Sequence, residues 1–340
     1  MMKVACIGAG YFARFHHDGW SRMAGVEFAA ICDADIAKAE ASAREFGASR
    51  TFADIGRLIA EIQPDLIDIA TPPPTHLPII RACIDHNIPV ICQKPFCGGL
   101  EGATEAVRLS EASGVPVIVH ENFRFQPWFA EAGRQLAKGA VGNPYQVTFR
   151  LRPGDGRGPE AYLDRQPYFQ QMERFLVHET AVHIIDVFRF LMGPVTAVTA
   201  QLARLNPAIS GEDAGFILFE FASGARGLFD GNRLSSHASE NRRRTMGEMW
   251  LEGSEAVLQL DGDGGLSLRP HDSNSSVTIS YDWEDTGFAG DCVYKLQRHI
   301  IDTLTAGTAP ANTARDYLTN LRLVEAVYQS SAEGRRIEIS

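Results

Sequence analysis

The sequence contains no long hydrophobic run, and this absence limits where the chain can reside. Among its 340 residues, no apolar stretch approaches the ~20 residues that a membrane-spanning helix requires. The first apolar segment begins almost at Met1, with no basic region before it and no cleavage-site spacing after it. We therefore expect neither a membrane span nor a signal peptide, and a cytoplasmic location.

Paired cysteine motifs and basic runs are also absent. The six cysteines form no C-x-x-C pair, and Cys6, Cys32 and Cys92 lie inside apolar, strand-like segments, so we expect buried free thiols. The net charge is -10, and Arg242–Arg244 is a short, isolated basic cluster. Nucleic acid and anionic membranes are therefore not expected as partners, and no cluster of ligand residues suggests a metal.

Two sequence patterns indicate two domains, which we place at residues 1–121 and 122–340. In the first, short apolar segments alternate with helical ones, which predicts a parallel sheet covered on both faces. In the second, strand-like segments follow one another across short turns, which predicts an antiparallel sheet. The expected strands are 4–7, 28–32, 66–70, 89–92 and 115–119, then 146–151, 196–205, 216–221, 225–230, 249–252, 256–260, 266–269 and 277–281; the expected helices are 11–23, 36–46, 55–61, 77–85, 102–111, 171–191, 291–304 and 314–331.

The second sheet is expected to carry helices on one face only. Its other face would then be exposed to solvent, and an extended exposed face of this kind is typical of an interface between subunits. We therefore expect a homodimer or homotetramer.

A glycine motif follows the first expected strand. The sequence from Gly8 to Ala13 fits G-x-G-x-x-[GA] between a strand and a helix, where Gly8 allows a tight turn and Gly10 lets main-chain amides approach a pyrophosphate. Asp33 ends the second strand, where an acidic side chain binds the adenosine ribose and repels a 2′-phosphate. The motif therefore predicts NAD as the cofactor.

Two further loops follow later strands of the same expected sheet. One is Thr71-Pro72-Pro73-Pro74-Thr75-His76, and the other is Gln93-Lys94-Pro95. A lysine that ends a buried strand is costly unless its ammonium has a role or a partner, so we expect Lys94 to face a ligand. The alternatives are a turn without a ligand role and a surface lysine. The expected cofactor contacts are Gly8, Gly10, Tyr11, Phe12, Asp33, Thr71, Pro72, His76, Gln93, Lys94 and Asn122.

A polar stripe lies on the helix expected over residues 171–191. His178 and His183 are five residues apart, which is about 140° on a regular α-helix and excludes the zinc-protease arrangement. Glu179, His183 and Asp186 share one face instead. This predicts His183 as a general base whose pKa and tautomer are set by neighbouring carboxylates, with a solvated polar stripe as the alternative.

With these motifs the chain resembles the glucose–fructose oxidoreductase, inositol dehydrogenase and rhizopine-catabolism family of oxidoreductases. The resemblance covers essentially the whole chain and also rests on Asn122-Phe123-Arg124-Phe125, on Arg189-Phe190-Leu191-x-Gly193 and on the closing helix. It implies an α/β fold: an N-terminal Rossmann domain with a doubly wound parallel sheet, and a C-terminal α/β domain with a large, open, mostly antiparallel sheet. It also implies a nicotinamide cofactor, a catalytic lysine at Lys94 and an acid–base histidine at His183.

Three positions depart from the family pattern. Gln93 replaces the common Glu and removes a charge beside Lys94. Glu179 stands where the family usually has Asp, so its carboxylate arm is one carbon longer. Thr180-Ala181 replaces a Gly that often precedes the histidine, which fits an uninterrupted helix.

The resulting hypothesis is a dehydrogenase that oxidises a sugar or polyol hydroxyl, an aldose to a lactone or a cyclitol to a ketone. In it His183 takes the hydroxyl proton, Lys94 hydrogen-bonds to the developing carbonyl oxygen, and Glu179 binds a neighbouring hydroxyl or tunes the base. Further substrate contacts are expected from Asn122, Arg124, Arg152, Tyr168 and Phe169, with 152–171 as a loop over the site. A reductase of biliverdin or dihydrodiol type and a non-catalytic nucleotide-binding regulator stay open as alternatives.

Overall fold

The computed structural model describes residues 1–339, which form two compact units. The first unit contains Met1–Asn122 and Asp291–Leu321, and the second contains Phe123–Gly290 and the described residues from Arg322 onward. The sequence analysis expected one boundary, after residue 121. The structure instead returns 291–321 to the first unit, because the buried Gln297 side chain hydrogen-bonds to Asp68 and to the His16 carbonyl there.

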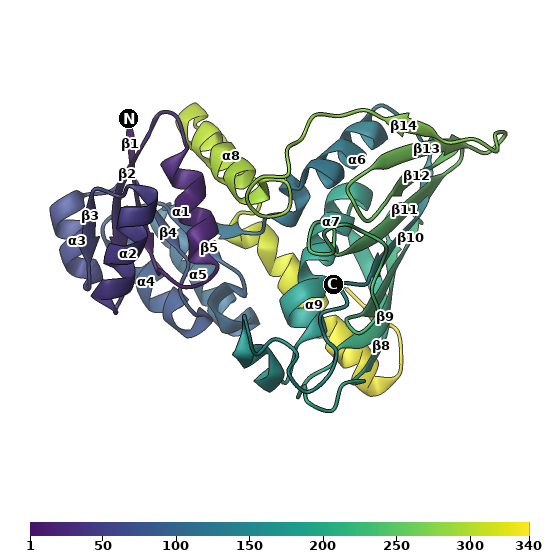
Figure 1. The fold of residues 1–340 in the computed structure, drawn as a ribbon, viewed down its shortest axis with the longest axis horizontal. Coiled ribbons are helices and arrows are strands. Elements are labelled where there is room, and N and C mark those ends of the chain that lie inside the picture. Colours follow the sequence, from purple (N-terminus) through teal and green to yellow (C-terminus); the bar gives the residue numbers. More distant parts are fainter. Residues whose placement is uncertain (340) are drawn as a thin grey trace. The chain divides into compact units, whose positions relative to one another are not determined.

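The first unit is built on a six-stranded parallel sheet, which confirms the predicted Rossmann-type fold (Figure 1). The strand order is β3-β2-β1-β4-β5-β6, so the order reverses between β1 and β4. In a doubly wound sheet, ligands bind at the carboxyl ends of the strands beside this reversal. The strands are β1 (Met2–Ile7), β2 (Val26–Cys32), β3 (Arg50–Phe52), β4 (Leu66–Ile69), β5 (Val90–Gln93) and β6 (Val117–His120).

Short-range capping defines several helices of this unit. Asp35 Oδ1 accepts a hydrogen bond from the Ala37 amide, and Asp54 Oδ1 accepts one from the Arg57 amide, so each aspartate begins a helix. These local signals explain why the expected helix bounds agree closely with the structure. The helices are α1 (Ala13–Ser21), α2 (Ile36–Phe46), α3 (Ile55–Ile62), α4 (His76–Asp85), α5 (Leu100–Ser113) and α8 (Cys292–Ala306), and the first part of α9 (Ala314–Glu333) also belongs here.

The second unit contains a nine-stranded sheet of order β14-β13-β12-β11-β7-β10-β9-β8-β15 (Figure 1). Its neighbouring strands are antiparallel except for β7 and β10, which are parallel, so the predicted mostly antiparallel sheet is confirmed. The strands are β7 (Pro144–Leu151), β8 (Val195–Ala203), β9 (Ala214–Phe221), β10 (Arg226–Asn232), β11 (Gly247–Gly253), β12 (Ala256–Leu260), β13 (Leu266–Pro270), β14 (Val277–Ile279) and β15 (Ile337–Glu338).

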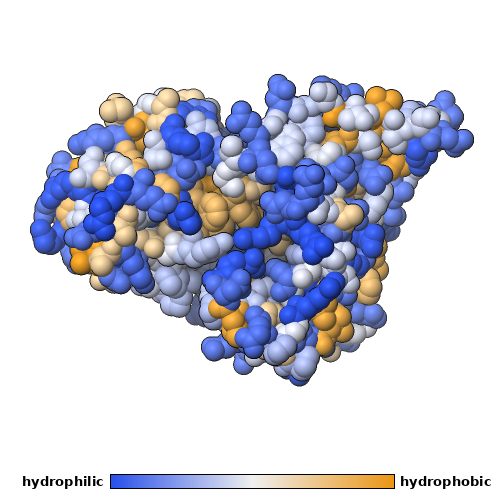
Figure 2. Space-filling model, in the orientation of Figure 1, coloured by the Kyte–Doolittle hydropathy of each residue, from blue (hydrophilic) through white to orange (hydrophobic). Residues whose placement is uncertain are grey.

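The two faces of this sheet differ in burial. Along β7, Val147 and Phe149 are buried whereas Gln146 and Arg150 are exposed, which is the alternation of a strand covered on one side. The helices α6 (Pro127–Ala137) and α7 (Val182–Met192) lie on the covered side (Figure 1). Figure 2, in which the sheet lies at the right-hand edge, shows hydrophobic residues scattered among hydrophilic ones there.

The helix expected over residues 171–191 is wrong in its first half. The structure has a short 3₁₀ segment at Pro167–Gln171, a π-helical turn at Leu176–Ala181, and then α7. Glu212 explains the interruption, since its Oε1 accepts hydrogen bonds from the Phe175 and Val177 amides and its carbonyl accepts one from the Leu176 amide. Glu212 thus supplies the hydrogen-bond acceptors that a preceding helical turn would otherwise provide to these amides.

The remaining bulk expectations can be compared directly with the described residues. All six cysteines are free thiols, and five of them are buried, as predicted. Within residues 1–339, no helix is both long and apolar enough to cross a membrane.

Candidate cofactor-binding and acid–base sites

The turn at Gly8 follows β1 and is shaped by contact with the neighbouring strand. Gly8 has a φ of +108°, and a Cβ atom there would lie 2.6 Å from the Ala70 carbonyl oxygen. At Gly10 a Cβ atom would meet nothing within 4 Å. Gly8 is therefore required by the fold, whereas Gly10 leaves open space in front of α1.

Asp33 connects the end of β2 to this turn. Its Oδ2 accepts a hydrogen bond from the Ala9 amide at 2.8 Å, and its Oδ1 accepts one from the Asp35 amide at 2.9 Å. The carboxylate thus braces the glycine turn while it stays partly exposed. Its remaining lone pairs can accept hydrogen bonds from a ribose diol, so the open space at Gly10 and the acid at Asp33 fit NAD.

The loop Thr71–His76 is held from inside by a buried histidine. His76 Nε2 donates to the Thr71 carbonyl at 2.8 Å, and Nδ1 accepts from the Cys97 amide at 3.3 Å. Burial lowers the pKa of His76, although the Thr71 carbonyl partly offsets this. His76 thus positions the loops after β4 and β5. Thr75, the residue before α4, makes no side-chain cap, and its hydroxyl hydrogen-bonds to Thr71 Oγ1 and to the Pro72 carbonyl.

Lys94 follows β5 and is half-buried. Its amide donates to Gln93 Oε1 at 2.6 Å, and its peptide bond to Pro95 is cis.

Asn122 is buried at the end of the first segment of this unit, 2% exposed. Around the predicted cofactor contacts, Tyr11 is 43% exposed, and Phe12 is the residue just before α1.

In the second unit, His183 lies in the first turn of α7 and is 5% exposed. The Phe123 ring stacks on it with centroids 4.0 Å apart and planes 4° apart. This stacking fixes the plane of the imidazole. A buried ring of fixed orientation is what a general base requires.

Arg124 and Asp186 form a bidentate ion pair within the second unit. Arg124 Nε donates to Asp186 Oδ2 at 2.7 Å, and Nη2 donates to Oδ1 at 2.5 Å. Each carboxylate oxygen of Asp186 accepts one hydrogen bond from Arg124 and keeps a lone pair for a further donor. The pair anchors the Phe123–Phe125 turn, which carries the stacking ring, to α7.

Glu179 belongs to a second network of the same unit. Its Oε2 accepts from the Thr180 hydroxyl at 3.0 Å, and Arg233 Nη1 donates to Thr180 Oγ1 at 2.5 Å. Arg233 is 2% exposed and also pairs with Asp155, at 2.9 Å. Burial opposes ionisation of Asp155, but the charges of Arg233 and Arg165 and the hydrogen bonds from Arg233 and Tyr162 together outweigh it and lower the pKa of that carboxyl.

Sequence reasoning missed Arg233 and Asp155, which no motif marked. The guanidinium of Arg233 lies over the Phe175 ring at 4.7 Å and the Tyr162 ring at 5.2 Å, inside a cluster of buried aromatic residues. The sequence signal for this network is that residues 152–171 contain more aromatic residues than an ordinary surface loop.

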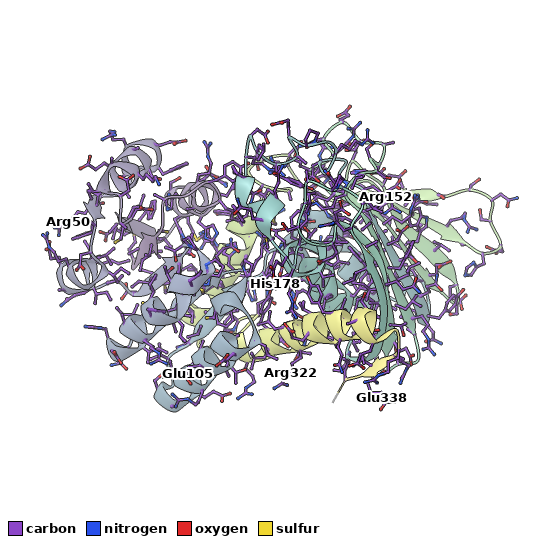
Figure 3. All side chains as sticks on the ribbon, turned by 90° about the horizontal axis from the view of Figure 1, so that it is seen from below. Arg50, Glu105, Arg152, His178, Arg322 and Glu338 are labelled. Atoms are coloured by element: carbon purple, nitrogen blue, oxygen red, sulfur yellow. The ribbon has the colours of Figure 1, made fainter. Side chains whose placement is uncertain are left out.

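The other predicted substrate contacts fall in different environments. Arg152 follows β7, and its guanidinium is held by Asp230 Oδ2 at 2.5 Å and by two carbonyl oxygens (Figure 3). Phe169 is 3% exposed and packs in the aromatic cluster, so it serves the core of the loop. Tyr168 is 55% exposed, and loss of hydration at its hydroxyl together with the Glu179 charge raises its pKa.

No group of three or more metal-ligating side chains occurs in residues 1–339. His178 lies in the π-helical turn and α7 begins only at Val182, so the angle of about 140° expected between His178 and His183 on a regular α-helix does not hold here (Figure 3).

Two family models match this chain. The first, an oxidoreductase family with an NAD-binding Rossmann fold, matches residues 2–121. The second, the C-terminal alpha/beta domain of that family, matches residues 134–339. The chain belongs to this NAD-binding oxidoreductase family. The resemblance inferred from the motifs is thus confirmed.

Individual relatives cover nearly the whole chain. D-apiose dehydrogenase of Paraburkholderia graminis is 37% identical over 99% of this chain and 89% of its own length. D-apiose dehydrogenase of Rhizobium rhizogenes is 31% identical over 99% and 97%. An oxidoreductase from Agrobacterium radiobacter, solved with NAD+, L-tartaric acid and magnesium, is 30% identical with a TM-score of 0.88 and covers 99% of this chain and 98% of its own.

The glycine turn yields a paired prediction. Gly8→Ala should lower the free energy of unfolding by about 1–3 kcal/mol, because it places a side chain in a left-handed, crowded backbone. Gly10→Ala should change stability by less than about 0.5 kcal/mol, since its methyl group meets open space. Both should weaken NADH binding at least about tenfold, as followed by NADH fluorescence titration. Full-strength binding by Gly10→Ala would contradict the assignment of this space to the cofactor.

The Arg233 network yields a stability prediction. Arg233→Met should cost about 3–5 kcal/mol because it removes the buried cation of the pair and leaves Asp155 with only its Arg165 and Tyr162 contacts. The control Arg336→Met removes an exposed pair with Glu220 and should cost under about 1 kcal/mol. Equal costs in denaturant melts would contradict a structural role for Arg233.

The same network predicts a pH dependence. Because the pKa of Asp155 is lowered in the folded protein, its ionised form stabilises the fold above about pH 4. This stabilisation is lost as the pH falls through the lowered value. The acid-side loss of stability should therefore be shallower in Arg233→Met than in the Arg336→Met control.

Proposed function

We propose that the protein oxidises a sugar hydroxyl with NAD+, with the C1 hydroxyl of cyclic D-apiose as the first candidate and a lactone as the product. The observation that carries the proposal is that Lys94 and His183 are both present and both held in ordered positions within their units. Two relatives that cover 99% of this chain are named D-apiose dehydrogenase, which supports this choice of substrate. Cyclitols are the second candidate, since an inositol 2-dehydrogenase of Mycolicibacterium vanbaalenii is 30% identical over 100% of the chain.

The first unit holds the cofactor in this proposal. Gly8, Gly10, Tyr11 and Phe12 would surround the pyrophosphate, and Asp33 would accept hydrogen bonds from the adenosine ribose. Thr71, Pro72, Gln93, Lys94 and Asn122 would contact the nicotinamide half, with His76 holding the loop between them. When bound, NAD+ supplies the acceptor for the hydride that leaves the substrate carbon.

Two side chains act on the substrate hydroxyl group in this proposal. His183 accepts the hydroxyl proton as the C–H bond breaks and the C=O bond forms, and its stacking on Phe123 keeps the ring aimed while this happens. Lys94 donates a hydrogen bond to the oxygen on which carbonyl character develops. Proton transfer of this kind contributes roughly 10²–10⁴-fold to a rate.

Specificity would come from the residues around Glu179. Its carboxylate accepts from Thr180, which leaves further lone pairs for a second substrate hydroxyl. The Glu179 charge adds to the loss of hydration that raises the pKa of the Tyr168 hydroxyl, so both residues belong to one electrostatic environment. Arg124 would contribute mainly through its ion pair with Asp186, and Arg152 through its contact with Asp230.

The direct test is a spectrophotometric screen at the NADH band with NAD+ against aldoses and cyclitols, D-apiose included. Lys94→Ala and His183→Ala should each lower kcat at least about 100-fold on the active substrate. The matched controls Lys138→Ala and His86→Ala change exposed residues of the same types and should stay within about twofold. NADH binding without turnover on any sugar or cyclitol would contradict the proposal and favour a nucleotide-binding regulator.

We further propose that the open face of the large sheet joins two copies of the chain. Phe216 and Leu218 of β9 are 53% and 51% exposed on this face, and exposed apolar side chains on a broad sheet are typical of subunit interfaces. The six free thiols suit a reducing, cytoplasmic setting for this oligomer.

A charge placed on this face tests the interface. Leu218→Lys should weaken association about 100-fold or more, because a two-fold interface contains the substitution twice. The control Leu163→Lys changes a residue that is 42% exposed outside the sheet, and it should not alter the mass measured by light scattering. A parent protein that is monomeric by light scattering would contradict the proposed interface.

A further inference from the structure

A buried polar cluster lies directly behind Lys94 in the first unit. Its members come from α1, β4 and β5: His16 and Asp68 are 0% exposed, and Gln93 is 8% exposed. His16 Nδ1 lies 2.8 Å from Asp68 Oδ2, and His16 Nε2 lies 2.9 Å from Gln93 Nε2. Gln93 Oε1 then accepts from the Lys94 amide at 2.6 Å. The three side chains thus form a continuous chain of hydrogen bonds that ends on the Lys94 main chain.

The direction of every hydrogen bond in this chain follows from one obligatory donor. A main-chain amide can only donate, so the Gln93 atom that faces Lys94 must be the carbonyl oxygen. The other Gln93 atom, its NH₂ group, must therefore donate to His16 Nε2. An imidazole nitrogen that accepts carries no proton, so the His16 proton lies on Nδ1 and is donated to Asp68.

A doubly protonated His16 does not fit beside Gln93. With both ring nitrogens protonated, His16 Nε2–H would point at the Gln93 NH₂ group. Turning the amide over would only move the conflict, because the NH₂ group would then face the Lys94 amide. Either orientation leaves two donors facing each other in a buried site, and an unmade buried hydrogen bond costs about 1–3 kcal/mol.

The surroundings of the cluster keep Asp68 ionised, as an acceptor for the His16 ring. The His120 ring lies against His16 with centroids 4.0 Å apart. Asp68 Oδ2 accepts from Trp20 Nε1 at 2.7 Å as well as from His16. Burial raises the pKa of Asp68, but the interactions with His16, His120 and Trp20 outweigh it, and the pKa falls to about 2.

We propose that Gln93 fixes His16 as the neutral tautomer protonated on Nδ1, and that Asp68, His16 and Gln93 are positioning residues for Lys94. The chain anchors the Lys94 amide to a carboxylate buried in the middle of the sheet. Only the consequence for catalysis rests on the proposed function. The tautomer itself is a property of the protein without substrate.

Glutamate at position 93 would change the protonation of His16 from one ring nitrogen to both. A carboxylate would accept from the Lys94 amide with one oxygen and require a donor on His16 Nε2 for the other. His16 would then carry both protons, while the cluster would keep a single negative charge overall. The amide found here therefore replaces a carboxylate–imidazolium pair by a neutral relay of the same shape.

The experiment is ¹⁵N NMR of protein labelled at histidine nitrogens, recorded at about pH 7 without substrate. His16→Asn assigns the resonance, and the exposed His86 serves as an internal reference. The parent protein should show His16 with a protonated Nδ1 and a bare Nε2, and Gln93→Glu should show both nitrogens protonated. A His16 protonated on Nε2 in the parent, or unchanged in Gln93→Glu, would overturn the proposal.

Kinetics test the positioning role separately. Gln93→Met removes the acceptor for the Lys94 amide and should lower kcat about tenfold with the KM for the sugar changed less than about threefold. Gln93→Glu still accepts from that amide and should lose less kcat than Gln93→Met. Equal losses in the two variants would overturn the positioning role. If no sugar is oxidised by the parent, the proposed function fails while the NMR result still decides the tautomer.

Discussion

The buried carboxylate of Asp68 is the constraint on which the first unit depends. A charge in the middle of a parallel sheet is tolerated only when hydrogen-bond donors surround it. Here three donors, His16 and Trp20 from α1 and Gln297 from α8, converge on the Oδ2 atom of Asp68, so one carboxylate oxygen binds together elements far apart in the sequence. Gly19 belongs to the same arrangement, since a Cβ atom there would lie 2.0 Å from Gln297 Oε1. This requirement explains why residues 291–321 return to the first unit.

The second unit likewise contains a buried ion that is held by several side chains, but here the ion is a cation. Arg233 is held by Asp155, by Thr180 and by the Phe175 ring, and through Thr180 it reaches Glu179. In both units a buried ion therefore lies two or three hydrogen bonds behind a residue proposed to touch cofactor or substrate. Burying such an ion has a high desolvation cost, but it leaves the half-buried residue that it supports few alternative conformations.

The parts of this structure that were predictable from sequence are those set by local chemistry. The glycine turn and Asp33 follow from strand–turn–helix spacing, and the two sheets follow from the change in strand rhythm near residue 122. The π-helical turn was not predictable because Glu212, which replaces its missing helical hydrogen bonds, lies 37 residues beyond Phe175. The pairing of Arg124 with Asp186, across 62 residues, is likewise a product of tertiary packing and could not be predicted from local spacing. The tautomer of His16 could be assigned only from the structure, in which Gln93 contacts both His16 and the Lys94 amide.

The central claim is that a hydride leaves a sugar carbon and is accepted by NAD+ on this protein. The most direct measurement uses D-apiose deuterated at C1 and mass spectrometry of the reduced cofactor and the sugar product. The account predicts NADH that is one mass unit heavier, with the deuterium at nicotinamide C4, together with a lactone that has lost it. Reduced cofactor without deuterium, or labelled sugar recovered unchanged while unlabelled cyclitols are oxidised, would contradict oxidation of apiose at C1.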